Sequence, residues 1–158
     1  MNVDVFLGLG SNMGEREALL DKACNEIERL IGPITGRSAF IETEPWGFQS
    51  ANRFLNGVVR CTTDLAPLQL LNTTQHIERL LGKRPCHATR RTASAPTFHD
   101  RPIDIDILFY GLQVIDMPRL RVPHPLMLQR DFVMTPLRQL LVQPGDERYT
   151  DLLARLFP

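Results

Sequence analysis

Residues 100–108 read Asp-Arg-Pro-Ile-Asp-Ile-Asp-Ile-Leu, and the fold and the chemistry can both be worked out from this stretch. Isoleucine and aspartate alternate from residue 103 to residue 107, which is typical of a strand with one face in a core. Asp104 and Asp106 then share the other face, with α-carbons roughly 6.5–7 Å apart. Two like charges at this spacing need a positive partner. Because hard carboxylate oxygens suit magnesium rather than zinc, we expect both aspartates to bind metal.

The periodicity on either side of this strand predicts an α+β fold. Before it we expect strands and helices over 3–9, 15–31, 34–43, 53–63 and 65–81. After it we expect short extended pieces near 112–116 and 119–123, and helical pieces over 126–130, 136–142 and 151–157. The order strand, helix, strand, strand, helix, strand predicts a ferredoxin-like sandwich, with a mainly antiparallel sheet and helices packed on one face.

Size and composition indicate one globular domain over residues 1–158. The net charge is zero and charged residues make up 23%, so we expect no nucleic-acid partner. Three scattered cysteines are too few for a disulfide framework or a zinc site. The chain begins without a basic signal segment, and no apolar run reaches membrane-spanning length. We therefore expect a soluble cytoplasmic protein without a membrane partner.

Basic residues gather around the two aspartates. Between residues 79 and 130 there are nine basic and four acidic residues, and the whole chain has 16 arginines against two lysines. A guanidinium binds phosphate through two parallel hydrogen bonds, which lysine cannot do. Arg119 and Arg121 share a strand face, and prolines on both sides of His124 fix the backbone before Arg130. These residues predict a wall that faces phosphate.

A third group combines aromatic rings with an amide. It consists of Thr43-Glu44-Pro45-Trp46-Gly47 and Phe54-Leu55-Asn56. Stacking rings and paired hydrogen bonds from an amide could together hold a flat heterocycle.

In this order, the motifs resemble those of the 6-hydroxymethyl-7,8-dihydropterin pyrophosphokinase family, which transfers pyrophosphate from ATP to a pterin alcohol in folate biosynthesis. Five motifs carry the resemblance: Leu9-Gly10-Ser11-Asn12, Thr43-x-Pro45-x-Gly47, Phe54-Leu55-Asn56, Arg101-x-x-Asp104-x-Asp106-Ile107-Leu108, and Val122-Pro123-His124-Pro125 through Arg130-x-Phe132-Val133. The family's ferredoxin-like fold agrees with the element order above.

The resemblance implies small-molecule substrates, namely ATP as co-substrate and the pterin alcohol, and we expect a monomer. It implies two Mg²⁺ ions bound by Asp104 and Asp106 against the ATP phosphates. Catalytic roles are implied for Asp104, Asp106, Arg101, His124 and Arg130. The implied pterin pocket consists of Thr43, Pro45, Trp46, Phe54, Asn56 and Phe132. The implied ATP site consists of Gln75, Glu78, Arg101, Ile107, Arg119, Arg121, His124 and Arg130.

The chain departs from the family pattern in two places. Phe54 stands where members usually carry tyrosine, so only its stacking role is implied. The segment before Asp104 is longer than usual, so Lys83, Arg84, Arg90 and Arg91 cannot be matched one to one. We expect residues 83–99 to form a mobile lid over ATP, since they lack an apolar period.

Two alternative functions stay open at this point. One is a ferredoxin-like module that binds nucleotide or RNA, which would want exposed aromatic residues on its central strands. The other is a magnesium–ATP transferase with a different acceptor.

Overall fold

The computed structural model describes residues 2–44, 52–83 and 102–158. The elements of the first two thirds of the chain are β1 (Val3–Ser11), α1 (Arg16–Leu30), β2 (Ile34–Arg37), β3 (Ile41–Thr43), β4 (Phe54–Thr63), α2 (Pro67–Leu80) and β5 (Asp104–Tyr110). The remaining elements are β6 (Ile115–Asp116), β7 (Arg121–Val122), the 3-10 helix η2 (Met127–Gln129), α3 (Asp131–Leu140) and α4 (Glu147–Leu156). The α+β class and the order of the long elements are confirmed, except that the segment expected over 34–43 divides into the two short strands β2 and β3.

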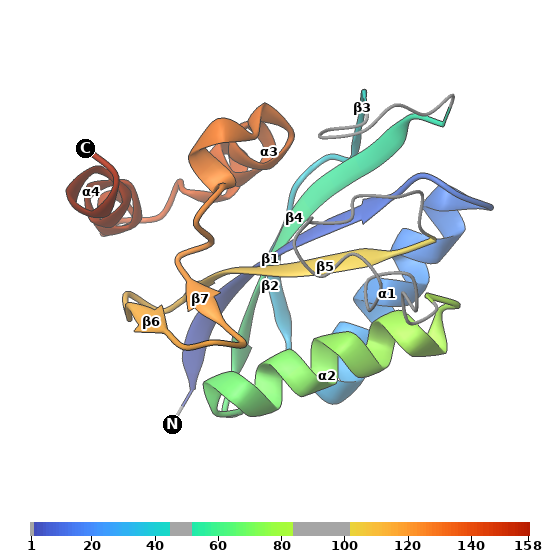
Figure 1. Ribbon diagram of the computed structural model, residues 1–158, viewed down its shortest axis with the longest axis horizontal. Coiled ribbons are helices and arrows are strands. Elements are labelled where there is room, and N and C mark those ends of the chain that lie inside the picture. Colours follow the sequence, from blue (N-terminus) through green and yellow to red (C-terminus); the bar gives the residue numbers. More distant parts are fainter. Residues whose placement is uncertain (1, 45–51, 84–101) are drawn as a thin grey trace.

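The main sheet is antiparallel, with β1 at its centre (Figure 1). The strand order is β2-β4-β1-β5, and β3 pairs with the N-terminal part of β4, residues 54–56. In this register Gly10 of β1 lies opposite Asn56 of β4 on one side and Asp104 of β5 on the other. Gly8 lies opposite Asp106. The sheet thus brings an amide and two carboxylates from distant parts of the sequence close together.

Helices cover both faces of this sheet, so the prediction that they pack on one face is wrong. α1 and α2 pack against Val5, Leu7 and other apolar side chains of the first face. α3 and α4 pack against Phe6, Val58 and Leu108 on the second face (Figure 1). The reason lies in β1, β4 and β5, whose second face is also apolar over part of its length. α3 and α4 cover that apolar end, and the other end carries Asn56, Asp104 and Asp106.

The C-terminal helices differ from the sequence prediction in their limits. The helix expected over 136–142 is α3, which begins at Asp131 and contains Pro136. Proline lacks the N–H that would bond one turn back, which is why it was expected at a helix start. Here the burial of Val133, Met134, Leu137 and Leu140 against the second face favours the longer helix.

A buried ion cluster connects α4 to the sheet. The guanidinium of Arg60 on β4 donates to both oxygens of Asp146 at 2.8 and 3.1 Å, and to Asp4 of β1 at 2.9 Å. The same group lies over the ring of Phe6, 4.8 Å from its centroid. The cluster therefore fixes where α4 begins on the second face. Among the helices of the described ranges, none is long and apolar enough to span a lipid bilayer.

Candidate active site

The two aspartates of β5 lie where the sequence predicts. Ile105 and Ile107 are buried in the core beneath α1 and α2, so Asp104 and Asp106 face the opposite side. Each carboxylate has a cation nearby. Lys83 Nζ donates to Asp104 Oδ1 at 2.9 Å, and Arg130 Nη1 lies 3.7 Å from Asp106 Oδ2. These cations offset the repulsion between two adjacent carboxylates.

Glu78 on α2 lies behind this pair. Its Oε2 accepts the backbone N–H of Ile105 at 2.8 Å and the ammonium of Lys83 at 3.2 Å. Burial raises the pKa of Glu78 above its ordinary value, against the attraction of Lys83. Burial works to lower the pKa of Lys83, but the attraction of Asp104 and Glu78 is stronger and raises it. The ammonium of Lys83 is therefore charged at neutral pH.

The first hollow lies beside Asp106, at the end of the second face that carries Asn56 and Asp104, and it has a volume of about 530 Å³. Its lining includes Gly8, Gly10, Thr43, Glu44, Phe54, Asn56, Asp104, Asp106, Arg130 and Phe132. Asn56 Nδ2 donates to Thr43 Oγ1 at 2.6 Å, which orients the amide at the edge of the hollow. A Cβ at Gly10 would lie 2.6 Å from Asn56 Oδ1, so glycine is needed there to keep the amide in place.

The structure thus brings four of the six predicted pterin residues around this hollow, namely Thr43, Phe54, Asn56 and Phe132. The other two, Pro45 and Trp46, lie outside the described residues.

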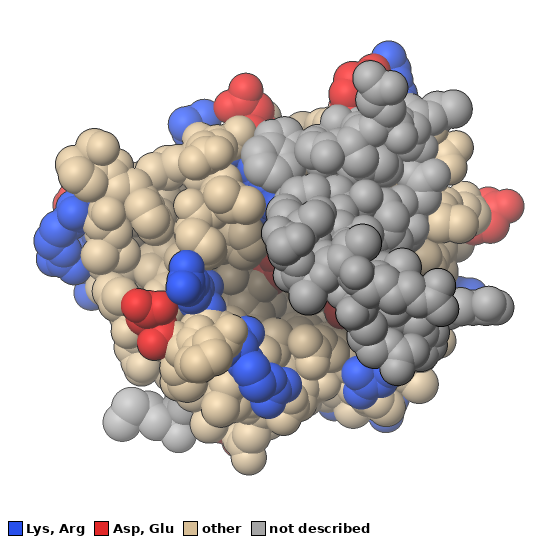
Figure 2. Space-filling view, viewed as in Figure 1, with Lys and Arg blue, Asp and Glu red and all other residues tan. Residues whose placement is uncertain are grey.

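The second hollow lies between β5, α2 and the β7 region, with a volume of about 730 Å³. Its lining includes Leu71, Asp106, Ile107, Arg119, Arg121, His124 and Pro125. Asp106 therefore lines both hollows. Figure 2 shows basic side chains on several sides of the hollowed surface next to the grey residues. Gln75 is half-buried on α2 and, in the described part of the chain, does not line this hollow.

The predicted basic wall divides into residues with different environments. Arg130 is buried, and its guanidinium lies 5.7 Å from the centroid of the Phe132 ring. Arg119 donates to Asn72 Oδ1 of α2 at 2.6 Å, while the exposed Arg121 pairs with Asp116 at 3.3 Å. Arg101, Arg84, Arg90 and Arg91 lie outside the described residues, as does almost all of the lid expected over 83–99.

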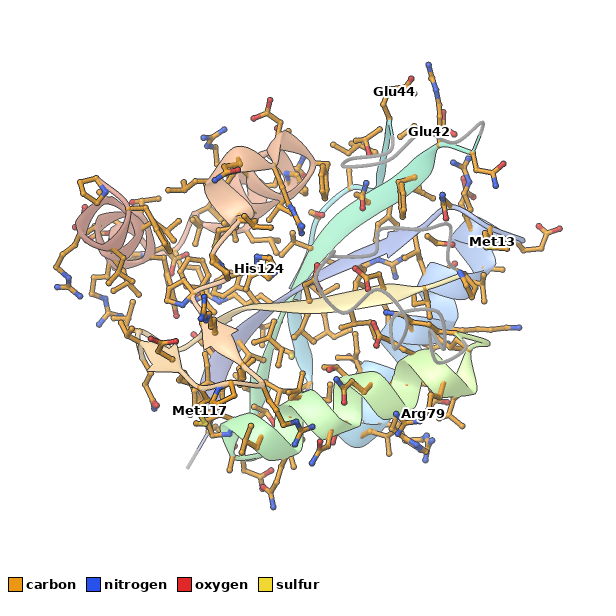
Figure 3. The ribbon with its side chains drawn as sticks, viewed as in Figure 1. Met13, Glu42, Glu44, Arg79, Met117 and His124 are labelled. Atoms are coloured by element: carbon orange, nitrogen blue, oxygen red, sulfur yellow. The ribbon has the colours of Figure 1, made fainter. Side chains whose placement is uncertain are left out.

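His124 lies on the segment between β7 and η2 (Figure 3). Its Nδ1 accepts the backbone N–H of Leu126 at 3.2 Å, so the proton of the neutral ring is on Nε2. Burial, together with the charge of Arg130, lowers the pKa of His124 to about 4. The ring is therefore neutral at pH 7 and offers one N–H donor beside the second hollow.

A family model described as 7,8-dihydro-6-hydroxymethylpterin-pyrophosphokinase (HPPK) matches residues 6–142. The chain belongs to the HPPK family. A 2-amino-4-hydroxy-6-hydroxymethyldihydropteridine pyrophosphokinase of Porphyromonas gingivalis is 45% identical over 134 residues, which cover 84% of this chain and 87% of the relative. The enzyme of the same name in Bacillus subtilis is 37% identical over 148 residues, covering 93% and 83% of the two chains.

Solved structures of HPPK-DHPS chains share the fold. One, an HPPK-DHPS in complex with substrates, matches with a TM-score of 0.63 at 14% identity over 89% of this chain. A triple mutant of Plasmodium falciparum HPPK-DHPS with SDX-DHP matches with a TM-score of 0.64 at 18% identity over 87% of this chain. This chain spans 40% of the length of each of these two chains. At such identities the likeness establishes the fold alone.

The donor set of this HPPK chain fits magnesium. Asp106 supplies hard oxygens at both hollows, and Asp104 supplies them at the first hollow. Within residues 2–44, 52–83 and 102–158, no group of three or more His, Cys, Asp or Glu side chains could hold a metal. Magnesium is commonly bound by one or two carboxylates and completed by water and substrate phosphates. Two aspartates on one strand face beside a hollow match the carboxylate part of that arrangement.

Sequence reasoning missed the partners of the predicted residues in this HPPK chain. Lys83 reaches Asp104 because α2 ends at Leu80 and Gly82 turns the chain with φ +104°. A glycine just past a helix is a recognisable signal for such a turn, but it does not indicate where the next side chain points. Asn72 lies on the α2 face toward β7, and no motif marks it as the partner of Arg119.

Proposed function

We propose that this chain transfers a pyrophosphoryl group from ATP to the hydroxymethyl oxygen of 6-hydroxymethyl-7,8-dihydropterin and releases AMP, a step of folate biosynthesis. Membership of the HPPK family supports this reaction. The observation that carries it is Asp106, whose carboxylate lines two hollows at once. A transferase needs its donor and its acceptor next to each other, and two adjoining sites with a shared carboxylate provide that proximity.

In this proposal the first hollow binds the pterin. Asn56 and Thr43 hydrogen-bond the polar edge of the ring, and Phe54 and Phe132 stack on its faces. Pro45 and Trp46 complete the pocket. The hydrogen bond from Asn56 to Thr43 supports a fixed orientation of the amide, which is what recognition of a heterocycle edge requires.

The second hollow binds ATP, with its phosphates toward Asp106. Arg130, Arg119, Arg121, Arg101 and the Nε2–H of His124 stabilise the negative charge of the phosphates, with Ile107, Gln75 and Glu78 on the nucleotide side. Two magnesium ions, when bound by Asp104 and Asp106, neutralise charge that develops on the phosphate oxygens. Attack by the hydroxymethyl oxygen on the β-phosphorus forms one P–O bond as the bond to the α-phosphate bridge breaks, so AMP leaves.

We further propose a single domain over residues 1–158 whose β1-α1-β2-β4-α2-β5 unit is a ferredoxin-like sandwich extended by α3 and α4. The strand order β2-β4-β1-β5 supports that description. We propose that the protein acts as a monomer in the cytoplasm, where free thiols such as Cys24 and Cys61 persist. ATP and the pterin alcohol are its proposed partners.

The product nucleotide tests the reaction. Incubation with ATP, magnesium and the pterin alcohol is expected to yield AMP and the pterin diphosphate, in equal amounts by chromatography. Omission of the pterin should remove both products. Formation of ADP with a pterin monophosphate would contradict pyrophosphate transfer, and AMP formed without the pterin would point to another acceptor.

A further inference from the structure

Lys83 connects the metal strand to a buried carboxylate of α2. Its Nζ lies 2.9 Å from Asp104 Oδ1 and 3.2 Å from Glu78 Oε2. The same oxygen of Glu78 accepts the Ile105 N–H at 2.8 Å, from the peptide between the two aspartates. Glu78 has a side chain only 9% exposed, so this contact lies inside the molecule. Lys83 is therefore anchored at one carboxylate and reaches a second.

The second carboxylate, Asp104, is one of the two that we assign to magnesium. A carboxylate oxygen that accepts a charge-assisted hydrogen bond at 2.9 Å cannot give its full charge to a metal ion at the same time. Lys83 and a divalent cation are thus alternatives for the same oxygen. The neighbouring Asp106 has Arg130 Nη1 at 3.7 Å from its Oδ2.

We propose that Lys83 is a built-in counter-ion of the metal site, which holds Asp104 in the metal-free protein and releases it when magnesium binds. Glu78 is the anchor that keeps the ammonium beside the site after Asp104 is released. The inference rests on the proposed function in one respect, that Asp104 is a metal ligand. Lys83 and Glu78 are positioning residues here, because they act through Asp104 and the strand that carries it.

Two consequences follow from this competition. Metal binding must break the Lys83–Asp104 bond, so removal of the ammonium should strengthen the binding of a divalent cation in the absence of nucleotide. Conversely, a bound cation should make the Lys83 amine more reactive toward a modifying reagent, because Lys83 then loses Asp104, one of its two carboxylate partners. The two effects are linked, as competing equilibria must be.

The first consequence can be measured as Mn²⁺ affinity by electron paramagnetic resonance, without nucleotide. Lys83→Met is expected to bind Mn²⁺ more tightly by on the order of tenfold, while Lys83→Arg, which keeps the charge, should resemble the wild type. Arg79→Met is the matched control for net charge. Arg79 is an exposed residue on α2, one position from Glu78, and Figure 3 shows it pointing away from the sheet. It should leave the Mn²⁺ affinity nearly unchanged.

The second consequence can be measured in the unmodified protein, so it does not depend on how a variant folds. The chain contains two lysines, Lys22 and Lys83, and Lys22 is exposed on α1. Reductive methylation followed by mass spectrometry is expected to modify Lys83 several-fold faster when Mg²⁺ is added, with no change at Lys22.

The outcomes separate this inference from the proposed function. Suppose that Asp104→Asn weakens Mn²⁺ binding, so that Asp104 is a ligand, but that Lys83→Met leaves the binding unchanged or weaker. This pair of results would overturn the counter-ion role alone. An unchanged Lys83 modification rate at saturating Mg²⁺ would do the same. Mn²⁺ binding that is equal in Asp104→Asn and wild type would overturn the metal assignment itself, and the inference with it.

Discussion

Asp106 lines both hollows, so in the proposed reaction its charge would act on the donor and the acceptor together. Asp106→Asn keeps the size of the side chain but removes the charge that attracts Arg130 and that we propose binds metal. We expect turnover to fall about a thousandfold or more, since loss of a metal ligand removes several kcal/mol of transition-state stabilisation. Thermal unfolding should be little changed. Steady-state kinetics at saturating magnesium check this prediction, and a near-normal rate would show that Asp106 binds no essential metal.

The protonation of His124 should make the unfolding free energy depend on pH. Its folded pKa of about 4 lies below the ordinary 6.5, so the unfolded chain takes up the proton first as pH falls. The contribution of the neutral ring to the unfolding free energy is thus fully present above about pH 6.5, and it is lost as pH falls toward 4. Between pH 7 and pH 5 this group alone should cost about 2 kcal/mol of unfolding free energy.

Urea unfolding of the wild type and His124→Gln at both pH values tests this expectation. Glutamine can keep a hydrogen bond to the Leu126 N–H but does not titrate. The loss of stability on acidification should be smaller in the variant by about 2 kcal/mol. Identical losses would show that His124 is not held neutral by its surroundings.

At the scale of elements, β5 could be predicted because isoleucine and aspartate alternate along it, which places them on opposite faces, and its contacts follow from that alternation. The second layer of helices could not be predicted in the same way. β4 is buried at nearly every position, and such a run gives no sign of which partner covers each face. The anchoring of Lys83 also escaped prediction, because it depends on where α2 ends and how Gly82 turns the chain.

The site, too, could be predicted only in part from the sequence. Asn56 and Asp104 lie 48 positions apart, and they meet because β1 pairs with β4 on one side and β5 on the other. The motifs predicted Asn56, Asp104 and Asp106, and these residues line the hollows. They did not predict that Glu78 would turn toward Ile105 and Lys83, since that contact is made by the packing of α2 against β5.

Apart from β5, which carries Asp106, the two hollows are lined by different elements, so the ligands proposed for them should be separable by mutation. Asn56→Ala on β4 should weaken pterin binding by about tenfold, since it removes the amide held by Thr43, and should leave ATP binding nearly intact. Asn72→Ala on α2 is the reciprocal variant. It removes the partner of Arg119 and should weaken ATP binding while pterin binding is kept.

Calorimetry with the pterin alcohol and, separately, with a non-hydrolysable ATP analogue measures both affinities. Equal losses for both ligands in either variant would contradict the division between the hollows.

On the scale of the whole molecule, the Arg60 cluster holds α4 on the second face at the end opposite the aspartates. Phe6 and Gly10 of β1 mark the two ends, with Arg60 opposite Phe6 and Asp104 opposite Gly10. Four residues of strand separate them, or about 13 Å. The cluster should therefore govern stability with little direct effect on catalysis.

Arg60→Met tests this separation. It leaves Asp146, whose side chain is 6% exposed, as a buried carboxylate without its guanidinium partner. Breaking one side of a buried pair costs about 3–5 kcal/mol, mainly because the remaining charge stays buried. Replacing both partners, as in Arg60→Met with Asp146→Leu, should cost less than the single change, because no charge is then left inside. Arg29→Met, which breaks an exposed pair with Glu26 on α1, should cost well under about 1 kcal/mol.

Urea unfolding gives the three free energies, and kinetics well below the unfolding transition give turnover. The expected order of destabilisation is Arg60→Met first, the double variant second and Arg29→Met last, with turnover near the wild-type value in all three. A double variant less stable than Arg60→Met would mean that the cluster contributes through packing rather than charge compensation. A large loss of turnover in the folded Arg60→Met protein would mean that the covered end of the second face does influence the aspartates, through β1.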